Sequence, residues 1–141
     1  MNNETYKTFN FSRFEKLEEL IIGNDCLENV NDYVIDGLNE LKSLKIGNSS
    51  FTHLKNNGEW DDDIANTTNR SFSILNCIEL ESVEIGHHSF YDYGGGFELL
   101  NLPKLSTIKI GEIGSRSSNF YYSSFEIKGI IDMILLMNRS S

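Results

Sequence analysis

The residues best suited to binding a metal ion stand in two short clusters. His87 and His88 are adjacent, and neighbouring side chains in a turn point apart, so this pair is poorly placed to share one ion. The run Asp61–Asp63, with Glu59 nearby, offers oxygen ligands but lacks the alternating ligands and the glycine of a calcium loop. A surface turn and a solvated charge run are the simpler interpretations. We therefore predict no bound metal and no cofactor.

Residues for phosphate binding or nucleophilic catalysis do not stand in the patterns that those reactions need. The triplet Gly94–Gly96 has no Lys or Ser/Thr in phosphate-binding register, which favours a flexible turn. Serine, histidine and aspartate are present, but no elbow motif arranges them as nucleophile, base and orienting acid. We predict that the protein is not an enzyme.

The charge and hydropathy of the chain argue against several classes of partner. The 12 Lys and Arg residues are outnumbered by 21 Asp and Glu residues, which gives a formal net charge of −9. Nucleic acids and anionic membranes both attract basic surfaces, so neither is expected as a partner. No apolar run approaches the roughly 20 residues of a membrane-spanning helix. The first residues are polar and lack the apolar stretch of a secretory signal, which predicts a cytoplasmic location.

The clearest feature of the sequence is a spacing of apolar residues that recurs along it. Counting from Tyr33, large apolar residues stand at offsets 0, 2, 5, 8, 11 and 13, and Gly47 follows at offset 14. The pattern starts again at four other aromatic residues, the last of which begins an incomplete copy: Phe9, Phe72, Phe97 and Phe125. Repeats of this length are typical of stacked coils, each of which buries its apolar edge against the next. We expect one domain over residues 1–141.

Within each unit the apolar offsets predict two short strands. Offsets 0 and 2 alternate inward, and so do offsets 11 and 13, whereas the steps of three between them turn the chain through a corner. Stacking places each strand about 4.8 Å from its copy in the next unit, which makes two short parallel sheets. Length differences fall in the return loops, and the longest insertion is the polar loop 52–71, which contains Trp60. Phe51 and Phe90, after the closing glycines, are expected to complete the core. The predicted fold is mainly β, with few helices.

The unit LNELKSLKIGNSSF, residues 38–51, resembles the leucine-rich repeat family, in the short glycine-turn variety of bacterial and protist proteins. The resemblance extends from Phe9 to Leu136. One departure concerns the asparagine of the motif L-x-x-L-x-L-x-x-N, because glycines stand near its usual place, which puts an asparagine ladder in question: Gly23, Gly47, Gly86 and Gly111. The resemblance implies a right-handed curved solenoid whose concave strand face usually binds another protein.

The candidate site is the set of outward positions on the second strand of each unit. Offsets 10 and 12 form a flat strip of mixed charge: Glu19, Ile21, Ser43, Lys45, Ser82, Glu84, Thr107 and Lys109. The strip is either a face that binds another protein or a solvated sheet stabilised by its own ladder of charges. We predict a non-enzymatic protein–protein interaction module. The alternative is a structural or self-associating repeat scaffold, including a fragment of a longer array.

Two other groups of apolar residues leave their role open. On the first strand, Val34, Leu75 and Leu100 point outward, and either form an exposed patch or lie under the long loop. In the last unit, apolar residues stand at offsets that are polar or mixed elsewhere: Ile131, Ile134, Leu135 and Met137. Either this segment folds over the last coil, with a helical cap across 127–137, or it docks on another molecule and mediates self-association.

Overall fold

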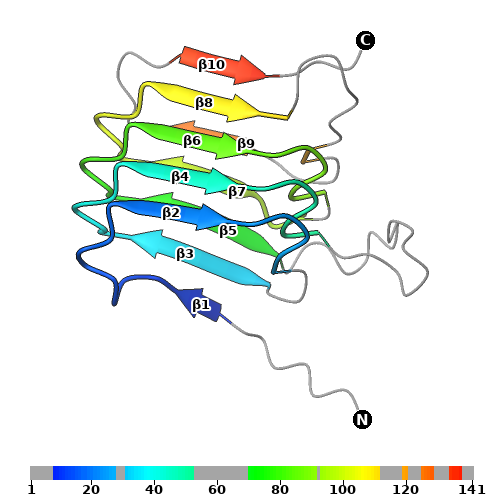
Figure 1. Cartoon of the computed structure of the whole chain (residues 1–141), viewed down its shortest axis with the longest axis horizontal. Coiled ribbons are helices and arrows are strands. Elements are labelled where there is room, and N and C mark those ends of the chain that lie inside the picture. Colours follow the sequence, from blue (N-terminus) through cyan, green and yellow to red (C-terminus); the bar gives the residue numbers. More distant parts are fainter. Residues whose placement is uncertain are drawn as a thin grey trace.

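A computed structural model of the protein describes residues 8–27, 31–52, 70–91, 93–111, 119–120, 125–128 and 134–137. These residues form two five-stranded parallel sheets and contain no helix (Figure 1). In spatial order, the first sheet comprises β1 (Thr8–Asn10), β3 (Asp32–Asp36), β5 (Ser71–Leu75), β7 (Phe97–Leu100) and β9 (Phe125–Lys128). The second comprises β2 (Glu19–Ile22), β4 (Ser43–Ile46), β6 (Ser82–Ile85), β8 (Thr107–Ile110) and β10 (Ile134–Met137).

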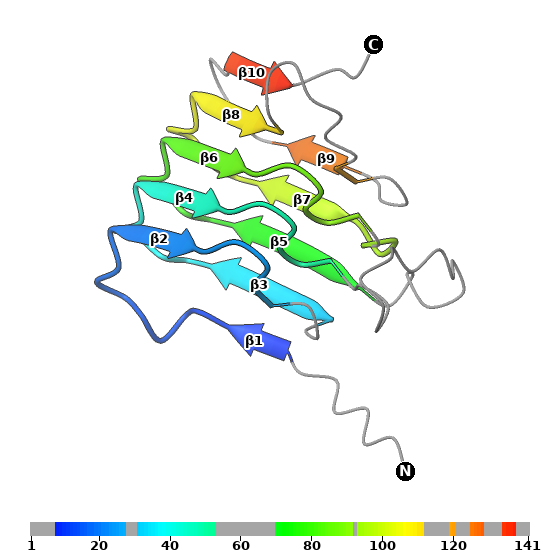
Figure 2. The same cartoon turned by 45° about the vertical axis from the view of Figure 1, so that its right-hand side comes forward.

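Each repeat unit contributes one strand to each sheet, so the two sheets lie face to face (Figure 2). The pairing between units follows the predicted offsets: Tyr33 lies opposite Phe72, and Phe72 opposite Phe97. In the second sheet Leu44 pairs with Val83 in the same way. The prediction of two short parallel sheets is therefore confirmed, and strands at equal offsets are neighbours.

The last unit departs from the prediction of a helical cap across 127–137. Its described residues form strands β9 and β10, which pair in parallel with β7 and β8. A strand here extends the backbone hydrogen bonding of each sheet, which a helix laid across the end could not do. The register is also one residue earlier than the repeat count predicts, because Leu135 pairs with Ile108 and Met137 with Ile110.

The core lies between the sheets and is closed on the return side by aromatic rings. Phe51 and Phe90 are fully buried, as predicted, and their rings stack with centroids 4.7 Å apart. Phe120 continues this column, stacked 5.5 Å from Phe90. The repeat pattern did not reveal Phe120, because residues 112–118 separate it from Gly111. The sequence feature that could have identified Phe120 is local: a polar residue, Asn119, precedes it, as serines precede Phe51 and Phe90.

A second aromatic column runs along the first sheet and packs edge-on against the first. Tyr33, Phe72 and Phe97 stack with successive centroid distances of 5.7 and 5.1 Å. The ring of Phe51 meets Tyr33 edge-to-face at 4.6 Å. Offset and edge-to-face pairs of this kind contribute about 0.5–1.5 kcal/mol each beyond their burial.

Buried serines join the turns of successive units. Ser50 Oγ donates to the carbonyl oxygen of Gly23 at 2.7 Å, and Ser89 Oγ donates to that of Gly47 at 2.9 Å. Each hydroxyl also accepts from a backbone amide, since Ser89 Oγ lies 3.2 Å from Ser50 N. The Asn119 amide takes the same place in the next turn and donates to Gly86 O at 2.7 Å. The hydroxyls of Ser50 and Ser89 are thus paired between units although they are out of reach of water.

Asparagines after the glycines form a second link between turns. Asn24 Oδ1 accepts from Asn48 N at 2.8 Å, and Asn48 Oδ1 accepts from His87 N at 3.1 Å. Asparagines therefore do connect adjacent units, one position beyond the glycines that put such a ladder in question. The equivalent residue of the third unit is His87, so the run of asparagines at this position ends there.

The closing glycines are required by the approach of the preceding unit. A Cβ at Gly47 would lie 2.6 Å from the carbonyl carbon of Gly23, and one at Gly86 would lie 2.6 Å from Asn48 N. Both contacts are with backbone, which cannot move aside without disturbing the turn. Gly23 differs, because its nearest atom would be Cys26 Sγ at 3.6 Å, an ordinary contact.

We expect Gly47→Ala to lower the free energy of unfolding by about 1–3 kcal/mol, because the methyl group overpacks against the neighbouring backbone. Gly23→Ala is the matched control and should leave stability unchanged or slightly raised, since its site is open. Urea unfolding of dilute protein, followed by circular dichroism, measures both. Equal losses at the two positions would show that turn conformation, and not the approach of the preceding unit, requires glycine.

Removing the buried hydroxyl in Ser89→Ala should cost about 1–3 kcal/mol, because Gly47 O and Ser50 N lose a shared partner inside the protein. Ser106→Ala is the control, since its exposed hydroxyl, 3.3 Å from Glu81 O, is replaceable by water. The same unfolding experiment compares them. Indistinguishable midpoints for the two variants would contradict the role of the serine link.

Candidate functional site

The eight predicted strip residues lie together on the outer face of the second sheet. Their side chains are exposed or half-buried and alternate with buried residues such as Leu44 and Ile46. Backbone pairing sorts them into two rows across the strands. The first row is Glu19, Ser43, Ser82 and Thr107, and the second, which we call the charged row, is Ile21, Lys45, Glu84 and Lys109. The predicted outward placement is confirmed, and the binding role stays a prediction.

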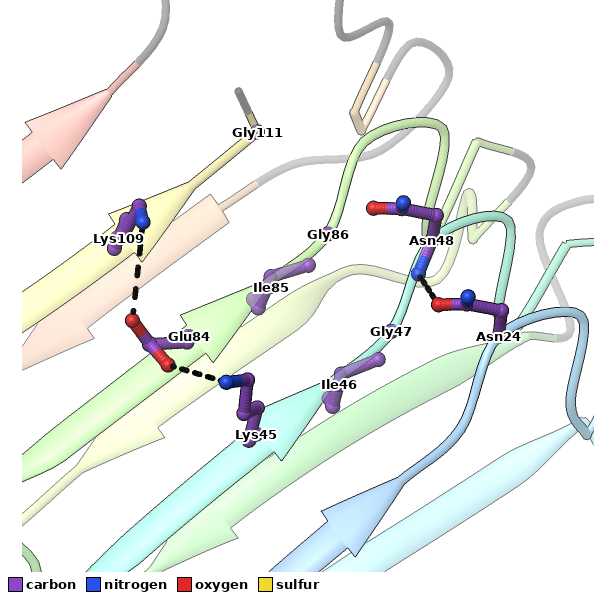
Figure 3. A pocket seen from close by; sticks show the side chains of 10 residues that line it. All are labelled: Asn24, Lys45, Ile46, Gly47, Asn48, Glu84, Ile85, Gly86, Lys109 and Gly111. Atoms are coloured by element: carbon purple, nitrogen blue, oxygen red, sulfur yellow. Dashed lines mark hydrogen bonds and ion pairs between the residues drawn. The ribbon is translucent and has the colours of Figure 1, made fainter. Parts of the chain in front are cut away.

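The centre of the charged row is a carboxylate shared by two lysines. Lys45 Nζ lies 3.7 Å from Glu84 Oε2, and Lys109 Nζ lies 3.9 Å from Glu84 Oε1 (Figure 3). Both distances are long for ion pairs, and the side chains are open to solvent. Water and salt screen such contacts, so each contributes little to stability. The three charged groups therefore keep most of their capacity to interact with an incoming molecule.

Shorter ion pairs lie at the corner between the strands, outside the strip. Lys16 Nζ contacts Glu40 Oε1 at 2.7 Å, and Lys104 Nζ contacts Glu79 Oε2 at 2.7 Å. Hydrogen bonding to these carboxylates raises the pKa of Lys16 and of Lys104. The corner positions share offset 7, which the sequence interpretation did not single out. The clearest charge links between units are thus at the corner, which weakens the idea that the strip charges serve only to hold the sheet together.

An open groove of about 350 Å³ runs beside the charged row, where the strands pass into the turns. Gly47, Gly86 and Gly111 form its floor, and Ile46 and Ile85 line it beside them. Lys45, Glu84 and Lys109 border one side, and the other lining residues include Asn24 and Asn48 (Figure 3). We call it the glycine groove. The sequence did not reveal it, because the glycines were interpreted as turn residues and not as a line of exposed backbone.

The backbone amides on the floor of the glycine groove are hydrogen-bonded within the protein. The backbone amides of its floor donate to carbonyls of the preceding unit, such as Gly47 N to Ile22 O and Gly86 N to Ile46 O, each at 2.8 Å. The floor amides are therefore occupied and do not form an anion cradle. The polar side chains that line the groove are those of the charged row and the two asparagines.

The other sequence candidates lie apart from the charged row. The rings of His87 and His88 meet edge-to-face with centroids 4.9 Å apart, and burial followed by the charge of His87 lowers the pKa of His88. The described residues contain no group of three metal-ligating side chains. Asp61–Asp63 and Trp60 lie outside the described residues. The outward residues of the first sheet, Val34, Leu75 and Leu100, are half-buried.

We expect Glu84→Gln to lower the free energy of unfolding by less than about 1 kcal/mol, with the difference vanishing at high salt, because both of its ion pairs are long and solvated. Glu79→Gln, at the corner, is the control with a short pair to Lys104. Urea unfolding at low and high salt tests this. A loss of several kcal/mol at Glu84 would mean that the charged row is a structural element.

Comparisons with known proteins leave the family of the chain unassigned. No family model, no curated protein and no solved structure matches it. None of the described residues belongs to a helix able to span a bilayer. The resemblance of the repeat unit to leucine-rich repeats therefore stays a prediction.

Proposed function

We propose that the protein is a right-handed, leucine-rich-repeat-like solenoid that binds another protein, without catalysis, through the charged row and the glycine groove. Two observations support the solenoid: each unit gives one strand to each parallel sheet, and units pair at equal offsets. Crossovers that join parallel strands of one sheet are right-handed in nearly all proteins, which supports the handedness. A cytoplasmic location remains a prediction.

The observation that carries the binding proposal is that the charged row borders the glycine groove. Lys45, Glu84 and Lys109 belong to both features. One face thus offers an alternating series of charges beside an open groove that is lined by glycines. A partner that presents acidic, basic and acidic groups in the same order would pair with the row while its backbone or small side chains fill the groove.

The rigidity of the surface favours binding. Each of the three central strands of the second sheet is hydrogen-bonded to a neighbour on both sides. Residues beneath the row, such as Leu44, Val83 and Ile108, are fully buried and hold the backbone in place. Side chains mounted on such a backbone lose little further freedom on association, which lowers the ordering cost of binding.

The sharpest test reverses all three charges at once, in Lys45→Glu/Glu84→Lys/Lys109→Glu. This variant keeps the alternation of signs, so its internal ion pairs and stability should persist, but it presents the opposite pattern to a partner. Glu79→Lys/Lys104→Glu exchanges a corner pair and is the control. Each immobilised protein would be incubated with a whole-cell extract, and bound proteins quantified by mass spectrometry.

A partner that binds the row should be retained by the wild type and the corner control and lost from the reversed variant. With that partner purified, we expect the reversal to weaken the affinity at least about tenfold, equivalent to roughly 1.4 kcal/mol. Equal affinities for all three proteins, with unchanged melting temperatures, would contradict binding at the charged row.

A further inference from the structure

The N-terminal end of the stack exposes residues whose counterparts in the next unit are core residues. Phe14 is 51% exposed, whereas Leu38, at the same offset in the next unit, is 1% exposed. Leu17 and Leu20 are likewise partly exposed, at offsets where the next unit is fully buried. The difference arises because each later unit has a unit in front of it. The first unit therefore carries an apolar end surface suited to another unit.

The backbone of β2 is also open on this side. In the second sheet β2 is an edge strand, paired with β4 alone among the described strands. In later units the closing glycine donates to the unit in front, as Gly47 N does to Ile22 O at 2.8 Å. Gly23 N has no acceptor among the described residues. An unpaired parallel edge is a template for a further strand.

Gly23 gives the most specific indication of which kind of unit would supply the further strand. At Gly47 and Gly86, glycine is required because the turn of the preceding unit lies against the Cα atom. At Gly23 the space is open, and φ lies outside the left-handed region. Nothing in the described part of the chain requires glycine at this position. If a further unit of the same type preceded the first unit, its turn would lie against Gly23 as the turn at Gly23 lies against Gly47. Glycine would then be required at position 23.

The other end of the stack offers a strand edge of the matching sense. β10 pairs with β8 alone among the described strands. Its register places Leu136 in line with Lys109, so Leu136 extends the charged row at the end of the sheet opposite Ile21. Ile21 is 62% exposed. If β10 of one molecule paired with β2 of another in the same register, Leu136 would lie beside Ile21 and both sheets would continue across the junction.

We propose that two copies of this chain associate head to tail, with the C-terminal edge, β9 and β10, of one copy stacked on the N-terminal edge, β1 and β2, of the next. This arrangement stacks a repeat unit on the end that exposes Phe14 and Leu17, and it supplies an acceptor for Gly23 N. A two-fold pairing of β2 with β2 is antiparallel and seats no turn against Gly23. The interface is heterologous, so it leaves one free end of each kind and allows further copies to add.

The association is tested with two variants that block opposite ends. Phe14→Lys/Gly23→Ala blocks the N-terminal edge. In the single molecule the Phe14 side chain is exposed and the space beside Gly23 is open, so both substitutions fit the folded chain. Leu135→Glu/Met137→Glu places charges on the C-terminal edge at the register positions that would meet the apolar Leu20 and Ile22 of the next copy. Circular dichroism establishes that each variant is folded, and light scattering over a range of concentrations gives the mass of each protein alone and of an equimolar mixture.

We expect the mass of the wild type to rise with concentration past that of a dimer, and each variant alone to remain a monomer. The mixture should form dimers and stop there, because each variant has one intact end of the opposite kind. A wild type that stays monomeric at millimolar concentration overturns the proposal, as does a mixture that stays monomeric beside an associating wild type. If Phe14→Lys/Gly23→Ala associates like the wild type, the N-terminal edge is not the contact.

The reversed variant Lys45→Glu/Glu84→Lys/Lys109→Glu separates this proposal from the binding of a different protein. It should associate like the wild type, because its substitutions lie on the central strands of the second sheet and not at either end. Loss of association in this variant would place the contact between copies on the charged row and would also overturn the head-to-tail arrangement.

Discussion

The close approach of successive turns is the constraint on which the rest of the structure depends. Where the second sheet ends, one unit lies against the backbone of the next so tightly that a Cβ at Gly47 would be 2.6 Å from Gly23. At this spacing buried serines join the turns, and so do the asparagines that follow the glycines. The same spacing lets the rings of Phe51 and Phe90 stack. Both phenylalanines adopt positive φ, 55° and 58°. Such strain costs about 1–3 kcal/mol per residue and persists because the packing around it permits no other arrangement.

The repeat spacing was sufficient to predict the two sheets, their register over four units and the outward face of the strip. It succeeded because a period of two fixes which side chains point inward, and the fixed offsets fix which strands pair. It failed where the chain between fixed points changes length. Phe120 follows a longer segment after Gly111, and β10 begins one residue earlier than the count. The glycine groove was missed for another reason, since it arises from contact between units and no single unit contains it.

The distribution of charge divides the surface into two parts with different physical roles. At the corner, pairs such as Lys16 with Glu40 are short, and they link successive units directly. On the outer face, Glu84 lies between two lysines at nearly 4 Å, and solvent competes for all three groups. These loosely held groups lie beside the glycine groove. In the proposed function, that difference, more than the presence of charge, separates the binding surface from the surface that stabilises the sheet.

The contact at the closing glycine also gives the stack a polarity. The turn of the second unit presents a hollow, Gly47, toward the unit before it, and a projection, the Asn48 side chain, toward the unit after it. A unit inserted in the same direction brings both halves of this fit with it, whereas a unit in the opposite direction would bring two hollows or two projections together. Duplication of a unit within the gene would therefore preserve the contact, so the number of repeats is free to vary during evolution while their direction is not.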